Sequence, residues 1–231
     1  MPTNIRLSDT WISFGLAFVG GYGDAAGFVL AKTFTGHVTG NLVLGAIAVA
    51  AHDWRATLGH LSAIVTFLIG VLVSVLIARP FKAWPSVPFL PIVMGIEGIL
   101  IVAASLALAS DAAHRVAIFV IFVSLALGLQ NGAFRRVGGI SVHTTYLTGM
   151  ITSLISSEAE KYPSGDAPPP IRARDPKMRL LCGIWAAFVL GAGTGAIMVL
   201  HFKSLGMLGA VLLLIVLIIR NPKGAQMTET N

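Results

Sequence analysis

The side chains best suited to chemistry are gathered in two stretches of an otherwise apolar chain. The first stretch runs through Gly20–Ala26 and Thr35–Asn41, and the second through Gly128–Ala133 and Thr144–Gly149. Together they offer a carboxylate, an imidazole, hydroxyls and amides, set among glycines that let helices approach closely or open. Such groups suit the binding of a solute, an ion or a proton inside a membrane.

Asp24 is the residue that most strongly indicates a function. A carboxylate in a membrane segment costs roughly 2.5–3.5 kcal/mol on insertion scales, and such residues usually face a cavity or a partner. We therefore expect Asp24 to bind substrate, ion or proton; the alternative is a buried tie to another helix, through Asn131 or a backbone amide. Asn131 occupies the matching position in the second stretch, without the charge. Glu97, in the middle of another apolar run, would serve in proton coupling or be a paired buried acid.

Hydroxyl, imidazole and amide groups complete the predicted site. Short, glycine-interrupted hydrophobic segments in corresponding positions are the best sequence pointer to a transporter binding site. The alternative for each threonine is a hydrogen bond between helices. The candidate binding residues are Asp24, Asn131, Glu97, His37, Thr35, Thr39, Asn41, Thr144, Thr148 and Tyr146. Arg135 and Arg136 are candidates for an anion contact, or else anchor a helix at the headgroup layer.

Composition identifies the chain as a polytopic membrane protein. Of its 231 residues, 55% are hydrophobic and 11% are charged, with a mean hydropathy of +0.84, whereas a soluble domain carries about 25% charged residues. The net charge of +6 comes from basic residues scattered between apolar runs, so no nucleic-acid partner is expected. A single cysteine, Cys182, excludes an internal disulfide and a multi-cysteine metal site, and no cofactor is predicted.

Eight apolar segments follow one another and predict an all-α transmembrane bundle. They cover about residues 11–30, 38–51, 58–78, 89–110, 115–133, 144–156, 178–200 and 205–219, and the second and sixth are short. The glycines at 20–24 interrupt the first segment, and Arg79-Pro80 is expected to stop the third. Residues 157–177 form a polar linker, and residues 220–231 form a polar tail.

The two halves of the chain are related in sequence. Three sets of residues recur in the same order, which predicts two transmembrane repeats, residues 1–110 and 111–231. Gly21, Asp24 and Ala26 match Gly128, Asn131 and Ala133; Thr35, Thr39 and Gly40 match Thr144, Thr148 and Gly149; and Phe67–Gly70 matches Phe188–Gly191.

The distribution of Lys and Arg separates two topologies. If all eight segments cross, ten basic residues lie on the side of the N-terminus and six on the other side. If each short segment is re-entrant, leaving six crossings, the counts are twelve and four, which fits the positive-inside rule better. Three crossings per half give an inverted 3+3 repeat, a plan common among secondary transporters, whereas eight crossings give 4+4. Both arrangements place the termini and the 157–177 linker in the cytoplasm.

Several motifs together resemble a known family. They are Gly21-Tyr22-Gly23-Asp24-Ala25, Thr39-Gly40-Asn41, Gln130-Asn131, Arg135–Gly139, and Thr144 with Gly149. This combination, spread over nearly the whole chain, resembles the YoaK-like family of bacterial inner-membrane proteins, which carry a domain of unknown function. The resemblance implies a multi-pass fold in the bacterial cytoplasmic (inner) membrane, and it implies no particular substrate or activity.

A secondary transporter or permease for a small solute is the function that this pattern favours, with proton coupling through Asp24 or Glu97. The main alternative is a non-catalytic membrane scaffold or assembly protein, which would use the same polar residues only for packing. A channel is less favoured because one chain shows no filter repeat or ring of charges. An enzyme is not expected because no catalytic constellation is present. The expected partners are the lipid bilayer and a small molecule or ion, and a homo-oligomer is left open.

Overall fold

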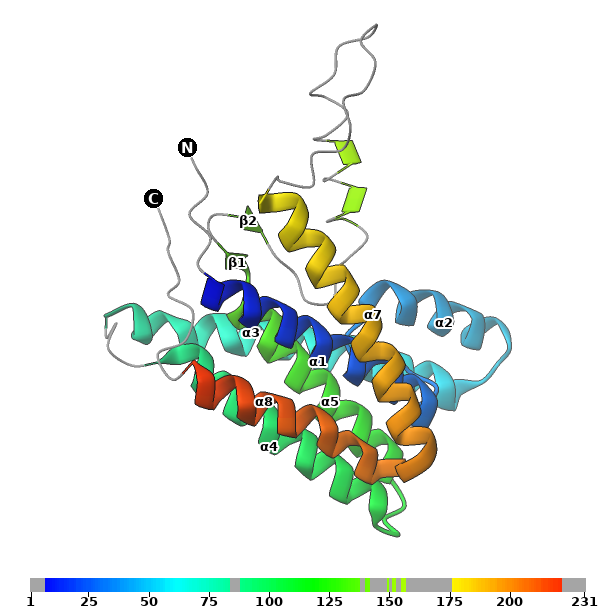
Figure 1. Ribbon diagram of the computed structural model, residues 1–231. Coiled ribbons are helices and arrows are strands. Elements are labelled where there is room, and N and C mark those ends of the chain that lie inside the picture. Colours follow the sequence, from blue (N-terminus) through cyan, green and yellow to red (C-terminus); the bar gives the residue numbers. More distant parts are fainter. Residues whose placement is uncertain are drawn as a thin grey trace, which may run out of the picture.

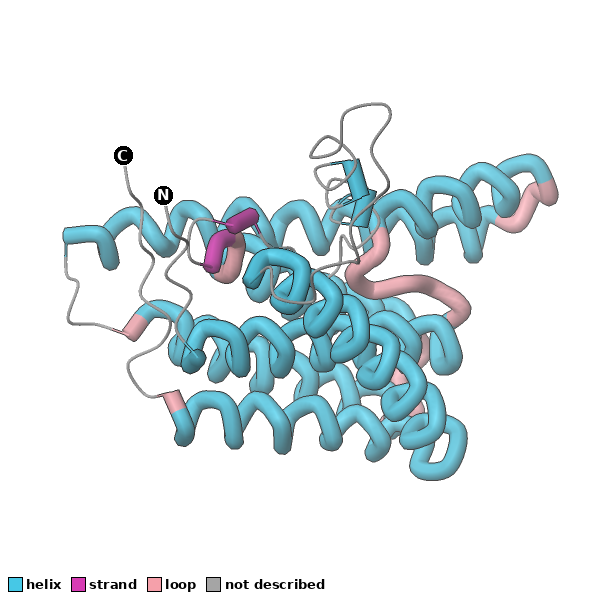
Figure 2. Tube along the Cα trace, turned by 45° about the horizontal axis from the view of Figure 1, so that its top comes forward, coloured by secondary structure: helices cyan, strands magenta, loops and turns pink. Residues whose placement is uncertain are grey.

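The computed structural model describes residues 7–83, 88–137, 140–141, 149, 151–152, 155–156 and 176–221, with the backbone alone at 82, 83, 136, 137, 141 and 176. The described chain is a helical bundle with one two-stranded ribbon, shown in Figures 1 and 2. Its elements are α1 (Leu7–Ala31), α2 (Val38–Ala50), α3 (Trp54–Ala83), α4 (Phe89–Ala109), α5 (Arg115–Ala133), β1 (Arg136–Val137), β2 (Ile140–Ser141), α7 (Pro176–Phe202), the 3-10 helix η1 (Lys203–Met207) and α8 (Leu208–Arg220).

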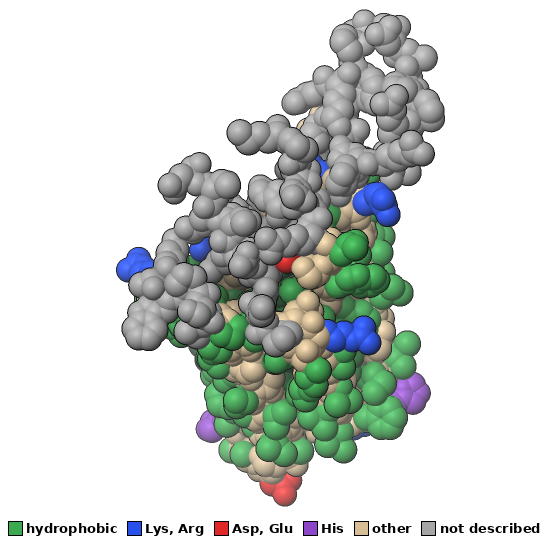
Figure 3. All heavy atoms as spheres, turned by 60° about the vertical axis from the view of Figure 1, so that its left-hand side comes forward, with side chains coloured by type: hydrophobic (Ala, Val, Ile, Leu, Met, Phe, Trp, Pro, Cys, Tyr) green, Lys and Arg blue, Asp and Glu red, His purple; other side chains and the backbone are tan. Residues whose placement is uncertain are grey.

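Five stretches of the described chain are long and apolar enough to cross a membrane. They are α1, α3 up to Phe81, α4, α5 and the stretch Lys177–Arg220, which contains α7 and α8. The chain turns between α7 and α8 at η1, where the two helices part in different directions (Figure 1). Large apolar side chains are exposed along the outside, for example Leu61, Leu68 and Leu72 of α3, and hydrophobic atoms cover most of the flank in Figure 3. An apolar outer surface of this kind suits lipid, and the all-α, multi-pass expectation is confirmed.

Two helices continue where the sequence predicted a break. α1 is one unbroken helix through Gly20–Asp24, so the predicted interruption there is wrong, because these glycines serve helix contact rather than opening. α3 runs through Pro80 to Ala83, so the predicted stop at Arg79-Pro80 comes one turn too early. Proline in a helix removes one N–H donor and crowds one carbonyl, a loss that the last turn of a long helix tolerates.

Two helix pairs approach each other at glycines, backbone against backbone. In the α1–α7 pair, a Cβ added at Gly21 would collide with the carbonyl oxygen of Phe188, and one added at Gly191 with that of Phe18. In the α3–α5 pair, the same collisions would occur between Gly70 and the carbonyl of Leu125, and between Gly128 and the carbonyl of Phe67. Only glycine permits this spacing, which increases the close-packed area that holds helices together in lipid.

The contacts also fix the relative directions of the helices. Along α1 and α7, Phe14 meets Gly183 and Tyr22 meets Gly195, so the two helices run parallel. Along α3 and α5, Phe67 meets Gly128 and Ser74 meets Gly132, so these two also run parallel. In contrast, α1 and α5 are antiparallel, because Leu16 pairs with Gln130 while the later Gly23 packs on the earlier Leu127.

The two helix pairs are joined through α4, α8 and η1. Gly98 of α4 faces Val211 and Leu214 of α8, with an added Cβ 3.8 Å from the first and 4.0 Å from the second. The Ser105 hydroxyl of α4 donates to the carbonyl of Ser204 in η1. The buried Tyr22 hydroxyl of α1 donates to the carbonyl of Gly206, so η1 is held from both sides.

α2 is the short helix expected from the sequence. Its thirteen residues span about 20 Å at 1.5 Å per residue, less than the roughly 30 Å of a hydrocarbon core. It packs beside α3 and lies at the edge of the bundle (Figure 1). Its other flank exposes Leu42, Val43 and Ile47.

Gly191 and Gly193 offer a matched test of the backbone contact, because both lie on α7 and a Cβ at Gly193 would meet nothing within 4 Å. We expect Gly191→Ala to lower the stability of the folded protein by about 1–3 kcal/mol, the usual cost of overpacking. Gly193→Ala should be neutral or slightly stabilising, because alanine favours the helix. Thermal unfolding in detergent measures both, and equal stability of the two variants would contradict the close crossing of α1 and α7.

Candidate functional site

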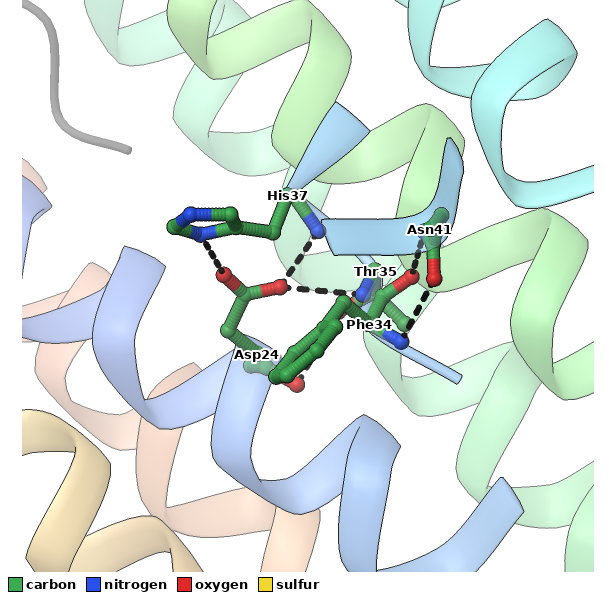
Figure 4. Close-up of polar contacts among 7 residues, drawn as sticks. Asp24, Phe34, Thr35, His37 and Asn41 are labelled. Carbon is green, nitrogen blue, oxygen red and sulfur yellow. Dashed lines mark hydrogen bonds and ion pairs between the residues drawn. The ribbon is translucent and has the colours of Figure 1, made fainter. Parts of the chain in front are cut away.

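Asp24 is buried near the end of α1, and its carboxylate faces the connection between α1 and α2. It is 4% exposed. Its Oδ1 accepts the backbone N–H of Thr35 at 2.9 Å and that of Gly36 at 2.6 Å. Its Oδ2 lies 3.3 Å from Nδ1 of His37 (Figure 4). Both carboxylate oxygens therefore have partners within the connection that leads into α2.

A second set of hydrogen bonds closes the same connection from the other side. The Asn41 amide donates to the carbonyl of Phe34 at 2.6 Å, and its Oδ1 accepts the Phe34 N–H at 3.1 Å (Figure 4). Nδ1 of the buried His60, on α3, lies 3.2 Å from the same Oδ1. The Thr35 hydroxyl donates to the carbonyl of Gly23 at 3.0 Å. The connection is thus tied to α1, α2 and α3 at once, and we call Asp24, Thr35, His37, Asn41 and His60 the connection cluster.

Small and aromatic residues let the connection lie close against α1. A Cβ added at Gly27 would come within 2.6 Å of the Thr35 methyl carbon, so glycine is required there. The Phe34 ring stacks on Phe28 of α1 with 4.7 Å between ring centroids. The Asp24 carboxylate below this connection is buried, and low exposure to water strengthens its hydrogen bonds.

The connection cluster has the geometry of a structural tie. A carboxylate that accepts hydrogen bonds from backbone N–H groups and lies beside an imidazole has its hydrogen-bonding capacity filled by the protein itself. This arrangement corresponds to the alternative of a tie through backbone amides. Of the other candidates on this stretch, Thr39 lies apart from the cluster, exposed on the first turn of α2.

His60 belongs to the cluster, although it was not among the residues predicted from the sequence. The sequence did contain an indication of its role, because His60 is the only histidine within the long apolar helix α3. Buried polar groups need hydrogen-bond partners, so an imidazole in such a helix predicts a partner, here Asn41.

Glu97 presents the opposite situation. It lies near the middle of α4, on a buried stripe with Val93, Met94, Ile101 and Ala104. Its side chain is 0% exposed, and neither carboxylate oxygen has a hydrogen-bond partner within the part of the chain that the structure describes. Buried charges in proteins are paired or take up a proton, so this carboxyl is poised to carry one.

Asn131 and the neighbouring Gln130 lie on the central helix α5. The Asn131 amide donates to the carbonyl of Leu127, one turn earlier on the same helix, at 2.9 Å. The Gln130 amide donates to the carbonyl of Leu16 on α1 at 3.1 Å. The bonds described for Asn131 and for Asp24 thus go to different partners.

The remaining candidates contribute less to the described structure. Arg135 is exposed just after α5, and Arg136 lies in the β1–β2 ribbon, paired in register with Ser141. The side chain of Arg136, and Thr144, Tyr146 and Thr148 entirely, fall outside the described residues. Within the described residues, no three His, Cys, Asp or Glu side chains are grouped as a metal site would need.

Asp24 also shifts the titration of His37, which lies in the connection outside the spanning helices. The hydrogen bond to the Asp24 carboxylate, helped by its negative charge, raises the pKa of His37 above the ordinary value of 6.5, against the opposite effect of partial burial. A pKa raised on folding stabilises the folded state at low pH. This contribution is complete below the unfolded pKa of about 6.5 and is lost as the pH rises through the folded pKa.

We expect Asp24→Ala to destabilise the protein, because it leaves the amides of Thr35 and Gly36 buried without their acceptor, at about 1–3 kcal/mol for each. The loss should be larger below about pH 6.5 and shrink as the pH rises through the His37 pKa, since only protonated His37 gains from the charge. Thermal unfolding of both proteins across pH measures this. A pH-independent difference would contradict the His37 part, and unchanged stability would contradict the tie.

Comparison with known proteins places the chain among membrane proteins of unknown function. Over 143 residues it is 27% identical to the UPF0700 transmembrane protein YoaK of Bacillus subtilis (strain 168). The match covers 61% of this chain and 63% of that relative, so the chain spans less than two thirds of the relative's length. No solved structure matches. Residues 12–219 match the family described as Protein of unknown function (DUF1275), and the chain belongs to that family.

Proposed function

We propose that this protein is a secondary transporter for a small solute and that Glu97 carries the coupled proton. The observation that carries the proposal is a fully buried carboxyl group near the middle of α4 with no partner among the described residues. An acid placed so is a functional group by default in a membrane protein. This assigns the proton-coupling role to Glu97 rather than to Asp24, whose oxygens are already engaged.

The coupling follows from the cost of an unpaired charge. Ionised Glu97 would be expensive in its present surroundings, so the conformation described here favours the protonated carboxyl. Release of the proton requires the group to meet water or a cationic partner, and this requires the helices around α4 to move. A proton and a conformational change are thus linked at one residue, as alternating access requires.

We further propose that the chain crosses the bacterial inner membrane six times, in two inverted halves. The antiparallel arrangement of α1 and α5 supports this. If α1, α3 and α4 each cross the membrane and α2 does not, α5 is the fourth crossing and runs opposite to α1. If α2 also crossed, α5 would be the fifth crossing and would run parallel to α1. The short length of α2 also favours a re-entrant segment. Twelve basic residues against four then place the termini in the cytoplasm.

The glycine contacts support the inverted repeat and suggest which parts move. Gly21, which approaches Phe188, and Gly128, which approaches Phe67, are sequence matches, and so are Phe188 and Phe67. The first crossing of each half therefore packs on the second crossing of the other half. We propose two structural units, each made of helices from both halves of the chain. One unit contains α1, α7 and α8, the other contains α3, α4 and α5, and the two units rock against each other.

Glu97 is buried on α4, a helix that packs against both α5 of its own unit and α8 of the other. A mid-membrane site between the units would therefore include it. A scaffold whose polar residues serve only for packing would gain stability from an apolar side chain at this position, because a buried polar group without a hydrogen-bond partner lowers stability and a well-packed apolar group does not. The presence of an acid there supports transport over the scaffold alternative.

Asp111 and Lys203 test the six-crossing topology. In the six-crossing arrangement both lie outside the cell, whereas eight crossings place Asp111 inside and Lys203 outside. In a Cys182→Ser background, we expect Asp111→Cys and Lys203→Cys to react equally with a membrane-impermeant thiol reagent in intact cells, since both native residues are exposed. Labelling of Lys203→Cys alone would support eight crossings and contradict six.

Glu97→Gln tests the transport proposal. The purified protein is placed in liposomes that contain a pH-sensitive dye, and sugars, amino acids, carboxylates, amines and alkali cations are added outside in turn. We expect one class to change the internal pH in the native protein. Glu97→Gln should abolish this change, because the amide preserves the shape of the side chain but carries no exchangeable carboxyl proton.

Met94→Leu provides the control, since it is a volume-conserving change on the same buried face of α4 and should leave the dye response intact. If Glu97→Gln changed the internal pH as the native protein does, Glu97 would not be the residue that couples the proton to transport. Absence of any response from correctly folded native protein, over all classes, would contradict a proton-coupled transporter and favour a scaffold.

A further inference from the structure

We infer that Glu97 exchanges its proton for a small cation, so that the solute belongs to the class of alkali or small organic cations and moves opposite to the proton. This inference rests on the proposed function and deepens it. It follows from the charges of the bundle interior, from the free coordination of the Glu97 carboxyl, and from the packing beside it.

The charges buried in the described bundle are acidic. Asp24 and Glu97 are buried, whereas no Lys or Arg is buried in the described residues. The basic side chains of the described helices that pack against α4 are exposed near helix ends: Arg115 of α5, Arg220 of α8, Lys203 of η1, and Arg55 and Arg79 of α3. Among the side chains that the structure describes, a solute at Glu97 therefore meets a carboxyl group and no buried cationic group, which favours a cation over an anion.

The two acids differ in what they can still bind. Asp24 accepts bonds from Thr35, Gly36 and His37. Both oxygens of Glu97 lack a described hydrogen-bond partner. Apart from Lys and Arg, the titratable side chain on these neighbouring helices is His60 of α3, which lies 3.2 Å from Asn41 in the connection cluster. Glu97 is thus the acid with free oxygens, and oxygen ligands are those that hard cations prefer.

The packing next to Glu97 is looser than the packing at the glycines where helix backbones cross. An added Cβ at the buried Gly98, the next residue, would meet nothing closer than 3.8 Å. At Gly21 or Gly128 the same Cβ would collide with backbone. The nearest atoms to Gly98 belong to Val211 and Leu214 of α8, which are side chains of the opposite unit and can withdraw when the units move.

A single carboxyl group cannot hold a proton and a cation at once. Binding of the cation displaces the proton, and protonation displaces the cation, so the two are coupled by mutual exclusion. The only bond exchanged is O–H: the carboxylic proton passes to a water molecule, and the carboxylate formed pairs with the incoming cation. One carboxylate thus accounts for one-for-one exchange.

The test is a titration that does not depend on transport. Infrared difference spectra of the purified protein follow the C=O band of the protonated carboxyl as the pH is raised, in sodium, potassium or tetramethylammonium chloride against a bulky inert cation. The Glu97 band is assigned by its absence in Glu97→Gln and by its presence in Asp24→Asn. Glu97→Asp should keep a titrating band, which guards against misfolding of the amide variant.

We expect at least one of the three cations to move the midpoint of the Glu97 band to lower pH. Once the cation is above its dissociation constant, the shift should be about one pH unit for each tenfold increase in concentration, as one-for-one competition requires. Changing chloride for sulfate should have no effect. A midpoint that no cation moves, or that follows the anion, would overturn the inference.

The failure of this inference is distinguishable from that of the proposed function. A cation that moves the Glu97 midpoint without exchange across liposomes would support the binding site and contradict transport. Proton movement driven by a neutral or anionic solute, with a midpoint insensitive to cations, would support transport and contradict the cation site.

Discussion

Close contact between helix backbones is the constraint on which the rest of this structure depends. In lipid the hydrophobic effect does not drive helices together, so packing contacts and hydrogen bonds must do so. Here α1 meets α7 and α3 meets α5 through reciprocal pairs of glycine and carbonyl oxygen. These two crossings set the direction and depth of four helices, and they leave α4 and α8 to close the bundle around η1.

The two buried acids illustrate two uses of a carboxylate in a membrane protein. Asp24 is surrounded by donors and fixes the connection that carries α2, so its charge is compensated locally. Glu97 is buried on α4, which packs against α5 and α8, and it has no such donors in the described chain. A compensated charge stabilises one conformation, whereas an uncompensated one favours protonation and becomes sensitive to movement of its neighbours. The proposals of proton coupling and of cation exchange follow from this difference.

Much of the architecture could be predicted from the sequence. The bounds of α4 and α5 agree with the apolar runs to within a residue, because a membrane span imposes a length and an apolar composition. Where the prediction was wrong, it assigned a local meaning to residues whose role lies in tertiary contacts. Gly20–Asp24 was read as an interruption of the first helix, but Gly21 serves the approach of α7, more than 160 residues away in the chain.

The sequence by itself determined the class of protein, the family and the identity of the polar residues inside the bundle, because hydropathy and intramembrane charge depend only on residue type. Tertiary structure alone decided which of those residues have hydrogen-bond partners. Asp24 and Glu97 are both acids in apolar helices, and nothing in their sequence neighbourhood distinguishes a satisfied carboxylate from an unsatisfied one. The distinction arises because the connection after α1 folds back to offer its amides to Asp24, whereas the helices around Glu97 present it with no described donor.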